Sequence, residues 1–347
     1  MFKDINISEA MNLPNNLLVD VRSEAEYLHD TIPGAVNIPV LNNEERAAVG
    51  LTYHHEGPVA ALKLGFSLVS PKLTAKLSTV QDLAGQRSLT VFCWRGGQRS
   101  YAMAQFFTQS GCDVYRITGG YKAYRRYVLD YLENRESAQR SIVLHGLTGV
   151  GKTDVLTRLS EKGLPVLDLE QMARHRGSVF GKIGLPPSPS QKAFESQIVR
   201  VLEESAHRGF FLVECESRKV GNLLTPGLVM DYIRRGVKIL LYCGMEQRIK
   251  RIKDVYAGSH DDNVAALQKA TASLTRLLGR TRVEELNERL VEKDYDRVIA
   301  FMLEHHYDPL YNYPCGPATG YDLCVDTDDI EKAAATIHGY VLALNDR

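Results

Sequence analysis

Residues 141–153 read Ser-Ile-Val-Leu-His-Gly-Leu-Thr-Gly-Val-Gly-Lys-Thr, an apolar run followed by a glycine-rich loop that ends in lysine and threonine. The apolar run predicts a buried strand, and the residues from Asp154 to Leu159 have the periodicity of a helix. In such a unit the glycines let backbone N–H groups surround a phosphate, the lysine adds positive charge and the threonine can hold a magnesium ion. A chance glycine-rich turn is the alternative, and the two correct flanks argue against it. The residues expected to bind phosphate in this P-loop are Gly146, Gly149, Gly151, Lys152 and Thr153.

Further buried strands are predicted on the carboxyl side of the loop, at residues 210–214, 237–242 and 321–325. The first of them ends in acids, Glu214 and Glu216, where a Walker B carboxylate would face the P-loop. Strongly helical segments lie between these strands. The second half of the chain therefore resembles the α/β sheet of nucleotide-kinase-like P-loop proteins.

A second anion-binding loop precedes this region. Residues 93–100 read Cys-Trp-Arg-Gly-Gly-Gln-Arg-Ser and lie between an apolar strand at 89–92 and a helix predicted from Tyr101. Two glycines, two arginines and a helix start make a cradle for negative charge, which favours the thiolate form of Cys93. A small buried structural cysteine is the alternative, but it needs no such cradle. Cys93 is therefore the predicted nucleophile, and the loop residues expected to hold its substrate are Trp94, Arg95, Gly96, Gly97 and Arg99.

Cysteine phosphatases and rhodanese-type sulfur transferases both use such loops, and the N-terminal landmarks favour the second. The segments Asp20-Val21-Arg22-Ser23, Ile32-Pro33-Gly34-Ala35 and Gly119-Gly120-Tyr121 stand in the order seen in a rhodanese domain. This part of the chain resembles that family, which implies a parallel sheet with helices on both faces. We interpret Asp20 and Arg22 as a buried ion pair that steadies the sheet.

Composition and charge limit the remaining classes. The chain has 347 residues, 44% of them hydrophobic and 24% charged, which suits two soluble domains. Its 42 basic and 42 acidic residues cancel, so a polyanion site must be local. The six cysteines form no CxxC pair, and neither a signal peptide nor a membrane span is recognised. We expect a cytoplasmic monomer without a metal site, and interpret His54 and His55 as surface or substrate-contact residues.

The polar stretch 133–140 is the best candidate for a linker. It predicts a rhodanese-like domain over residues 1–136. A P-loop domain with helical additions then covers residues 137–347.

Longer motifs connect the two halves to one family. They are Leu167-Asp168-Leu169-Glu170, Ala173-x-His175-Arg176-Gly177-Ser178-x-Phe180-Gly181, Pro189-Ser190-Gln191-x-x-Phe194-Glu195, Glu214-x-Glu216-Ser217-Arg218-x-x-Gly221-Asn222 and Tyr307-Asp308-Pro309-x-Tyr311. With the rhodanese-like half before them, these motifs resemble the bacterial tRNA 2-selenouridine synthases over nearly the whole chain. The resemblance implies an enzyme that replaces sulfur by selenium in wobble 2-thiouridine of tRNA, through an S-geranyl-2-thiouridine.

The same resemblance implies selenophosphate and geranyl diphosphate as substrates, with no tightly bound cofactor and with Mg²⁺ as a candidate ion. Cys93 would carry selenium as a perselenide, and the P-loop would hold the diphosphate of the geranyl donor. Two alternatives stay open: a sulfurtransferase fused to an ATP-dependent P-loop kinase or ATPase, and a non-catalytic tRNA-binding protein. The residues expected to line the second site are His175, Arg176, Ser178, Glu214, Glu216 and Arg218, although His175 could equally be a core histidine.

A basic run provides the tRNA candidates. Between residues 234 and 253 every charged residue except Glu246 is basic, so this segment could bind RNA phosphates. A solvated helix face is the alternative. The arginines expected to contact tRNA are Arg234, Arg235, Arg248 and Arg251.

Overall fold

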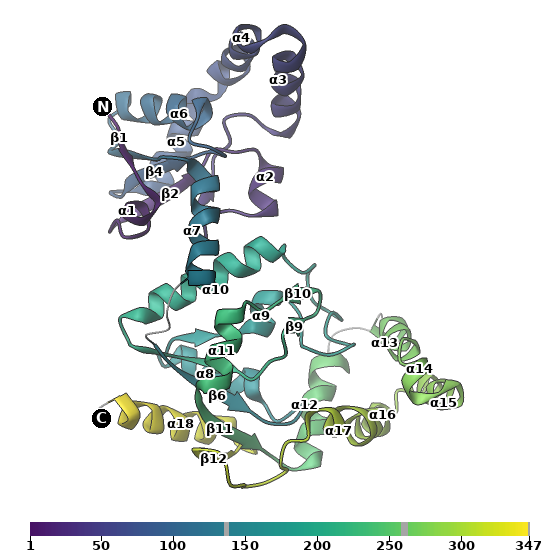
Figure 1. The fold of residues 1–347 in the computed structure, drawn as a ribbon. Helices are drawn as coiled ribbons and strands as arrows, with labels where there is room; N and C mark the ends of the chain where they lie inside the picture. Colours follow the sequence, from purple (N-terminus) through teal and green to yellow (C-terminus); the bar gives the residue numbers. More distant parts are fainter. Residues whose placement is uncertain (135–138, 258–262, 346–347) are drawn as a thin grey trace. The chain divides into compact units, whose positions relative to one another are not determined.

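A computed structural model describes residues 1–134, 139–257 and 263–345 (Figure 1). The chain divides into two compact units, one of residues 1–135 with 195–197 and the other of residues 136–194 with 198–347. The predicted domain boundary, between 136 and 137, lies outside the described residues, as do residues 135–138 of the predicted linker. Helix α7 (Gly120–Asn134) ends before this gap and strand β6 (Arg140–His145) begins after it.

The first unit contains a five-stranded, wholly parallel sheet in the order β1-β5-β4-β2-β3. Its strands are β1 (Lys3–Ile5), β2 (Asn16–Asp20), β3 (Val36–Asn37), β4 (Ser88–Phe92) and β5 (Val114–Ile117). The predicted parallel α/β sheet is thereby confirmed, and β1 is a strand that the sequence pattern did not reveal. Since β4 is the central strand, the Cys93 loop leaves the sheet at its middle.

Helices α1 (Ile7–Met11), α2 (Glu24–His29), α3 (Asn43–Glu56), α4 (Pro58–Val69), α5 (Leu73–Ala84) and α6 (Gln98–Gln109) complete this unit with α7 and the short 3-10 turn η1 (Ser70–Lys72). A capping box begins α2, because Glu26 reaches back to the backbone N–H of Ser23. His54 and His55 lie exposed in the last turn of α3. Helix α3 has no fully buried residue, and Val49 packs against the core of this unit while partly exposed.

The predicted Asp20–Arg22 ion pair is buried in the first unit, with side chains 0% and 1% exposed. Arg22 Nη2 lies 2.6 Å from Asp20 Oδ2 and also donates to the carbonyl oxygen of Asp30. The guanidinium lies 4.1 Å from the ring centroid of Tyr121. Because removing one partner would leave a buried charge unpaired, this pair holds the loop after β2 in place.

The second unit is built on another five-stranded parallel sheet, in the order β12-β11-β6-β8-β7. Beside β6 it contains β7 (Val166–Leu167), β8 (Phe210–Glu214), β11 (Val237–Tyr242) and β12 (Leu323–Asp326), while β9 (Lys219–Val220) and β10 (Leu223–Leu224) form a separate antiparallel pair. The strands predicted at 141–145, 210–214 and 237–242 are observed. The strand predicted at 321–325 is also present, but it begins at Leu323. The P-loop follows the central strand β6.

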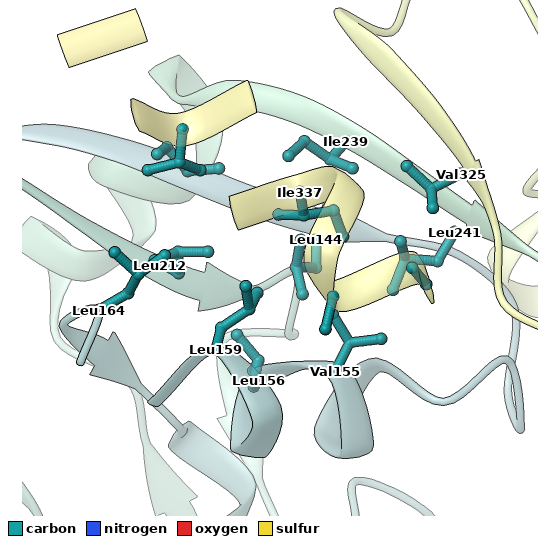
Figure 2. Close-up of a cluster of buried hydrophobic side chains, with 14 of the residues drawn as sticks. Leu144, Val155, Leu156, Leu159, Leu164, Leu212, Ile239, Leu241, Val325 and Ile337 are labelled. Atoms are coloured by element: carbon teal, nitrogen blue, oxygen red, sulfur yellow. The ribbon is translucent and has the colours of Figure 1, made fainter. Parts of the chain in front are cut away.

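The helices of this unit are α8 (Lys152–Glu161), α9 (Leu169–Ala173), α10 (Gln191–Ala206), α11 (Gly227–Arg235), α12 (Met245–Ala257), α13 (Asn263–Ala272), α14 (Thr275–Leu278), α15 (Arg280–Val291), α16 (Tyr295–Met302), the π-helical turn η2 (Leu303–Tyr307), α17 (Asp308–Tyr311) and α18 (Ile330–Asn345). Figure 2 shows side chains from β6, α8, β11 and α18 packed in one core, among them Leu144, Leu156, Leu241 and Ile337. Burial of this apolar surface fixes the P-loop helix α8 against the sheet. In the described part of the chain, no helix is long and apolar enough to cross a membrane.

Candidate active sites

Cys93 follows the last residue of β4 and is buried, with 3% of its surface exposed. Its Sγ lies 3.2 Å from Oγ of Ser100, which is itself fully buried in the first turn of α6. Gly97 is the N-cap of α6, so the loop runs directly into a helix start with free backbone donors. The structure thus places the thiol where an anion-binding helix terminus begins.

The loop depends on glycines at two close backbone contacts. Gly120 approaches Cys93 so closely that a Cβ would lie 2.1 Å from the Cys93 carbonyl oxygen, and a Cβ on Gly96 would lie 2.8 Å from the backbone nitrogen of Gly119. Across this contact Tyr121 N–H donates to the Cys93 carbonyl oxygen at 2.8 Å. The Gly119-Gly120-Tyr121 motif therefore holds the Cys93 loop from behind.

The arginines of this loop have different surroundings. Arg95 is exposed, whereas Arg99 donates to the Glu26 carboxylate, 2.7 Å from Oε2. Sequence reasoning missed Arg116 of β5, which donates to the Gly96 carbonyl oxygen at 3.3 Å and pairs with Asp4. Because Glu26 offsets the charge of Arg99 and Asp4 offsets that of Arg116, anion binding at this site also depends on the helix start at Gly97.

In the second unit, the P-loop wraps around the start of α8. Gly151 is the left-handed N-cap residue, with φ of 87°, and a Cβ on Gly146 would lie 2.4 Å from the Leu241 carbonyl oxygen. Lys152 Nζ donates to the carbonyl oxygens of Gly146 and Leu147, at 3.0 and 3.3 Å. These contacts place an ammonium group and the first N–H groups of α8 around one small volume, as phosphate binding requires.

Arg248 is expected from the sequence to contact tRNA, and its place in the structure contradicts that expectation. Its side chain is 3% exposed, and it forms an ion pair with Asp308 while its Nε donates to the carbonyl oxygen of Thr148 at 2.8 Å. This arginine ties the P-loop to α12 and α17, so it is not available to an RNA phosphate. Sequence spacing could not show this, because only the packing of α12 decides which of its faces is buried.

Arg251, the next basic side chain on that face, lines the P-loop cavity and donates to the carbonyl oxygen of Thr327. A Cβ on Gly151 would lie 3.4 Å from its Nη1. It is therefore placed to meet a ligand phosphate rather than an outer RNA strand. Arg234 and Arg235 are both exposed in the last turn of α11, and Arg234 pairs with Asp231.

A carboxylate cluster adjoins the P-loop. One carboxylate oxygen from each of Glu170, Glu214 and Glu216 lies within 4.8 Å of the others. Burial, followed by the nearby Glu216 charge, raises the pKa of Glu170 to about 8. Burial also raises the pKa of Glu214, of Glu216 and of the neighbouring Asp168. Asp168 and Glu170 were not among the predicted site residues, although their motif was visible as two acids directly after a short apolar run.

Of the other residues predicted to line the second site, some line the cavity and some do not. Arg176 and Ser178 line the cavity, and Arg176 lies 5.3 Å from the ring centroid of Tyr256. His175 does not line it, since it is 7% exposed and packed so tightly that a Cβ on Gly221 would lie 2.5 Å from its ring. It is a core histidine, and Arg218 is exposed outside the cavity lining.

The cavity itself has a volume of about 620 Å³ and two chemically different sets of lining residues. One set comprises the P-loop, Arg251 and the carboxylates Glu170 and Glu216. The other is a wall of apolar and aromatic side chains from α12, α13, α15, α16 and η2: Ile252, Val255, Tyr256, Leu267, Leu290, Val298, Ile299, Met302, Leu303 and Tyr307. The sequence did not place this wall, because its members come from separate helices. A ligand that fills the cavity needs a phosphate-bearing head and an apolar body.

Known proteins match the chain over both units. Residues 6–127 match the rhodanese-like domain, and residues 139–320 match the tRNA 2-selenouridine synthase AAA domain. A relative from Sulfurovum sp. (strain NBC37-1), named tRNA 2-selenouridine synthase, is 31% identical over 87% of this chain and 89% of its own length. Another of that name, from Nitrosomonas europaea, is 31% identical over 89% of this chain and 92% of its own. The chain belongs to the tRNA 2-selenouridine synthase family.

Proposed function

We propose that this protein is a transferase that modifies the wobble uridine of tRNA, converting 2-thiouridine to 2-selenouridine through S-geranyl-2-thiouridine, with geranyl diphosphate and selenophosphate as substrates. Relatives carry the name tRNA 2-selenouridine synthase, which supports the tRNA substrate. The observation that carries the geranyl step is one cavity lined both by the P-loop and by an extensive apolar wall. The phosphates of a nucleotide would match the P-loop, but a nucleotide would leave much of the apolar wall without a partner.

In the geranyl step, the diphosphate occupies the P-loop, held by the N–H groups of α8, Lys152 and Arg251. The sulfur of 2-thiouridine attacks the first carbon of the geranyl chain, and the electrons of the breaking carbon–oxygen bond leave with the diphosphate. The uridine N3 proton is released. Lys152 and Arg251 stabilise the charge that develops on the departing diphosphate, while the apolar wall holds the chain away from water.

The selenium step is assigned to Cys93. Its buried thiol, the Ser100 hydroxyl and the helix start at Gly97 lie together, and Arg116, paired with Asp4, donates to the loop at the Gly96 carbonyl oxygen. Such a site suits a small, highly charged anion such as selenophosphate rather than a prenyl chain. The two donors thus have separate phosphate-binding loops, and we expect tRNA to be the acceptor for both donors.

The geranyl assignment is tested by adding bulk to the apolar wall of the cavity. Leu290→Phe adds bulk at a residue that lines the wall and is 2% exposed. We expect weaker binding of geranyl diphosphate with unchanged binding of inorganic diphosphate, both measured by calorimetry. Leu277→Phe, at a residue 63% exposed on α14, is the matched control. If the two ligands lose affinity equally in a variant with unchanged thermal stability, the prenyl chain lies elsewhere.

Nucleoside mass spectrometry tests the whole reaction. tRNA containing 2-thiouridine is incubated with the protein, with geranyl diphosphate alone and then with selenophosphate added. The proposal requires S-geranyl-2-thiouridine in the first incubation and 2-selenouridine in the second. If either product requires ATP, the alternative of an ATP-dependent P-loop enzyme is supported. If 2-selenouridine forms equally well without geranyl diphosphate, the geranyl route is wrong.

A further inference from the structure

The carboxylates beside the P-loop come from different elements that the sheet brings together. Glu170 lies in the first turn of α9, just after β7, while Glu214 ends β8 and Glu216 follows two residues later. Because β7 and β8 are parallel neighbours, their carboxyl ends meet at one edge of the sheet. One oxygen from each carboxylate lies within 4.8 Å of the others, close enough to share a single ion.

Glu214 has a buried carboxylate oxygen to which no N–H group of the described residues donates. The residue is 0% exposed, and its Oε1 accepts the backbone N–H of Glu170 at 2.9 Å. Its Oε2 is also buried and accepts no N–H donor within the described ranges, and the neighbouring Asp168 carboxyl can bond to Glu214 only if one of the two holds a proton. A buried carboxylate oxygen without a donor is costly, and Lys152 does not relieve it, since its ammonium group donates to the carbonyl oxygens of Gly146 and Leu147.

The backbone around the cluster leaves room for close approach to the carboxylates. Gly177 has a φ of +64°, and a Cβ there would lie 2.8 Å from Glu170 Oε1 and 3.1 Å from Glu216 Oε1. Any side chain at this position would therefore press on the two carboxylates. Thr153 completes the surroundings, because its Oγ1 lies 3.4 Å from Glu170 Oε2 and so joins the cluster to the P-loop.

Electrostatics favours a cation rather than further anions. Asp168 adds a fourth carboxylate near these three, and a diphosphate in the P-loop would bring more negative charge to the same place. Without a positive ion, or protons on the carboxylates, the two sets of negative charges would repel each other. Oxygen ligands at this spacing suit a hard divalent ion, and thiolate or imidazole ligands, which softer metals prefer, are not part of the cluster.

We propose that Glu170, Glu214 and Glu216 form a binding site for one Mg²⁺ or Mn²⁺ ion that is occupied before any diphosphate arrives. The site would then differ from one in which the P-loop threonine and the substrate phosphates supply most of the ligands. Once bound, the ion neutralises the carboxylates and presents its remaining coordination positions toward the P-loop. The carboxylates would bind the ion whether the phosphate-bearing ligand is a prenyl diphosphate or a nucleotide.

The test measures Mn²⁺ binding to the full-length protein by electron paramagnetic resonance, in buffer free of phosphate and diphosphate. We expect one occupied site in the wild type. Glu170→Gln and Glu216→Gln should each weaken binding by roughly tenfold or more. Glu204→Gln, on the exposed surface of α10, should bind as the wild type does, and Mg²⁺ should displace the Mn²⁺.

A Lys152→Ala variant separates this inference from the proposed function. It should lose affinity for geranyl diphosphate while it still binds Mn²⁺. The inference is overturned if the wild type binds no Mn²⁺ without diphosphate, since the carboxylates would then hold protons instead of an ion. It is also overturned if Glu170→Gln and Glu216→Gln, folded as judged by thermal melting, bind Mn²⁺ as tightly as the wild type.

Discussion

The Oγ of Ser100 lies 3.2 Å from the Sγ of Cys93 and 3.1 Å from the carbonyl oxygen of Gly97. One hydroxyl proton therefore has two acceptors. When Cys93 is a thiol, the serine can donate to the carbonyl, and when it is a thiolate, the serine can turn its proton toward the sulfur. The contact identifies Ser100 as a positioning residue for the nucleophile, seven residues after it in the sequence.

Ser100→Ala should slow the reaction of Cys93 with a small alkylating reagent at neutral pH by roughly tenfold or more, because a hydrogen bond to a charged group is worth about 1.5–3 kcal/mol. Peptide mass spectrometry can follow this residue separately from the other cysteines. Ser110→Ala is the matched control, since Ser110 lies just after the end of the same helix and its hydroxyl donates to the Phe106 carbonyl oxygen. Ser100→Thr should restore most of the rate, and an unchanged rate in Ser100→Ala would remove this role.

Cys93→Ala should abolish 2-selenouridine formation and leave geranylation and tRNA binding largely intact. The reason is that Cys93 lies in a loop with a helix start and arginines beside it, whereas burial raises the pKa of Cys243, which also precedes a helix and contacts an arginine. Cys112→Ala and Cys315→Ala serve as controls and should keep full activity. Nucleoside mass spectrometry gives the result, and full selenation by Cys93→Ala would show that the selenium carrier is another group.

Lys152→Ala should lose geranylation, because the variant lacks the charge that stabilises the departing diphosphate. Its Cys93 should stay competent for selenium transfer, since the loop of Cys93 does not include the P-loop. The decisive measurement supplies this variant with tRNA that is already geranylated. Recovery of 2-selenouridine supports separate sites, whereas continued failure with tRNA still bound would mean that the P-loop serves both steps.

Arginines that looked equivalent in the sequence should behave differently. Arg248→Ala leaves Asp308 without its partner and should lower the free energy of unfolding by about 3–5 kcal/mol, visible as a lower melting temperature. Charge reversal of the exposed Arg234 and Arg235 should leave stability nearly unchanged. It should instead weaken tRNA binding and flatten its salt dependence, because fewer counterions are released. Fluorescence anisotropy across salt concentrations would detect this, and unchanged tRNA affinity would place the RNA elsewhere.

Local sequence determined the two anion-binding loops. Each is a strand, a glycine-containing turn and a helix start that are continuous in the chain, so the residues around Cys93 and Lys152 carry their geometry with them. The parallel sheets also followed from the pattern, because buried strands alternating with helices allow few other arrangements. The short strands β1 and β7 did not, since runs of three and two residues carry no periodicity.

Only the tertiary structure decided what surrounds these loops. Both Arg248 and Arg251 lie on α12, but Arg248 is buried while Arg251 lines the cavity. The packing of that helix against the P-loop determines which of its faces is buried. The tertiary structure also joined Glu170 to Glu214 and Glu216 at the ends of neighbouring strands, and it assembled the apolar wall from several helices. Contacts between residues far apart in the chain depend on side-chain directions that are set when the elements pack. The sequence therefore identified the two glycine-containing loops, and the fold supplied the carboxylate cluster and the apolar wall beside one of them.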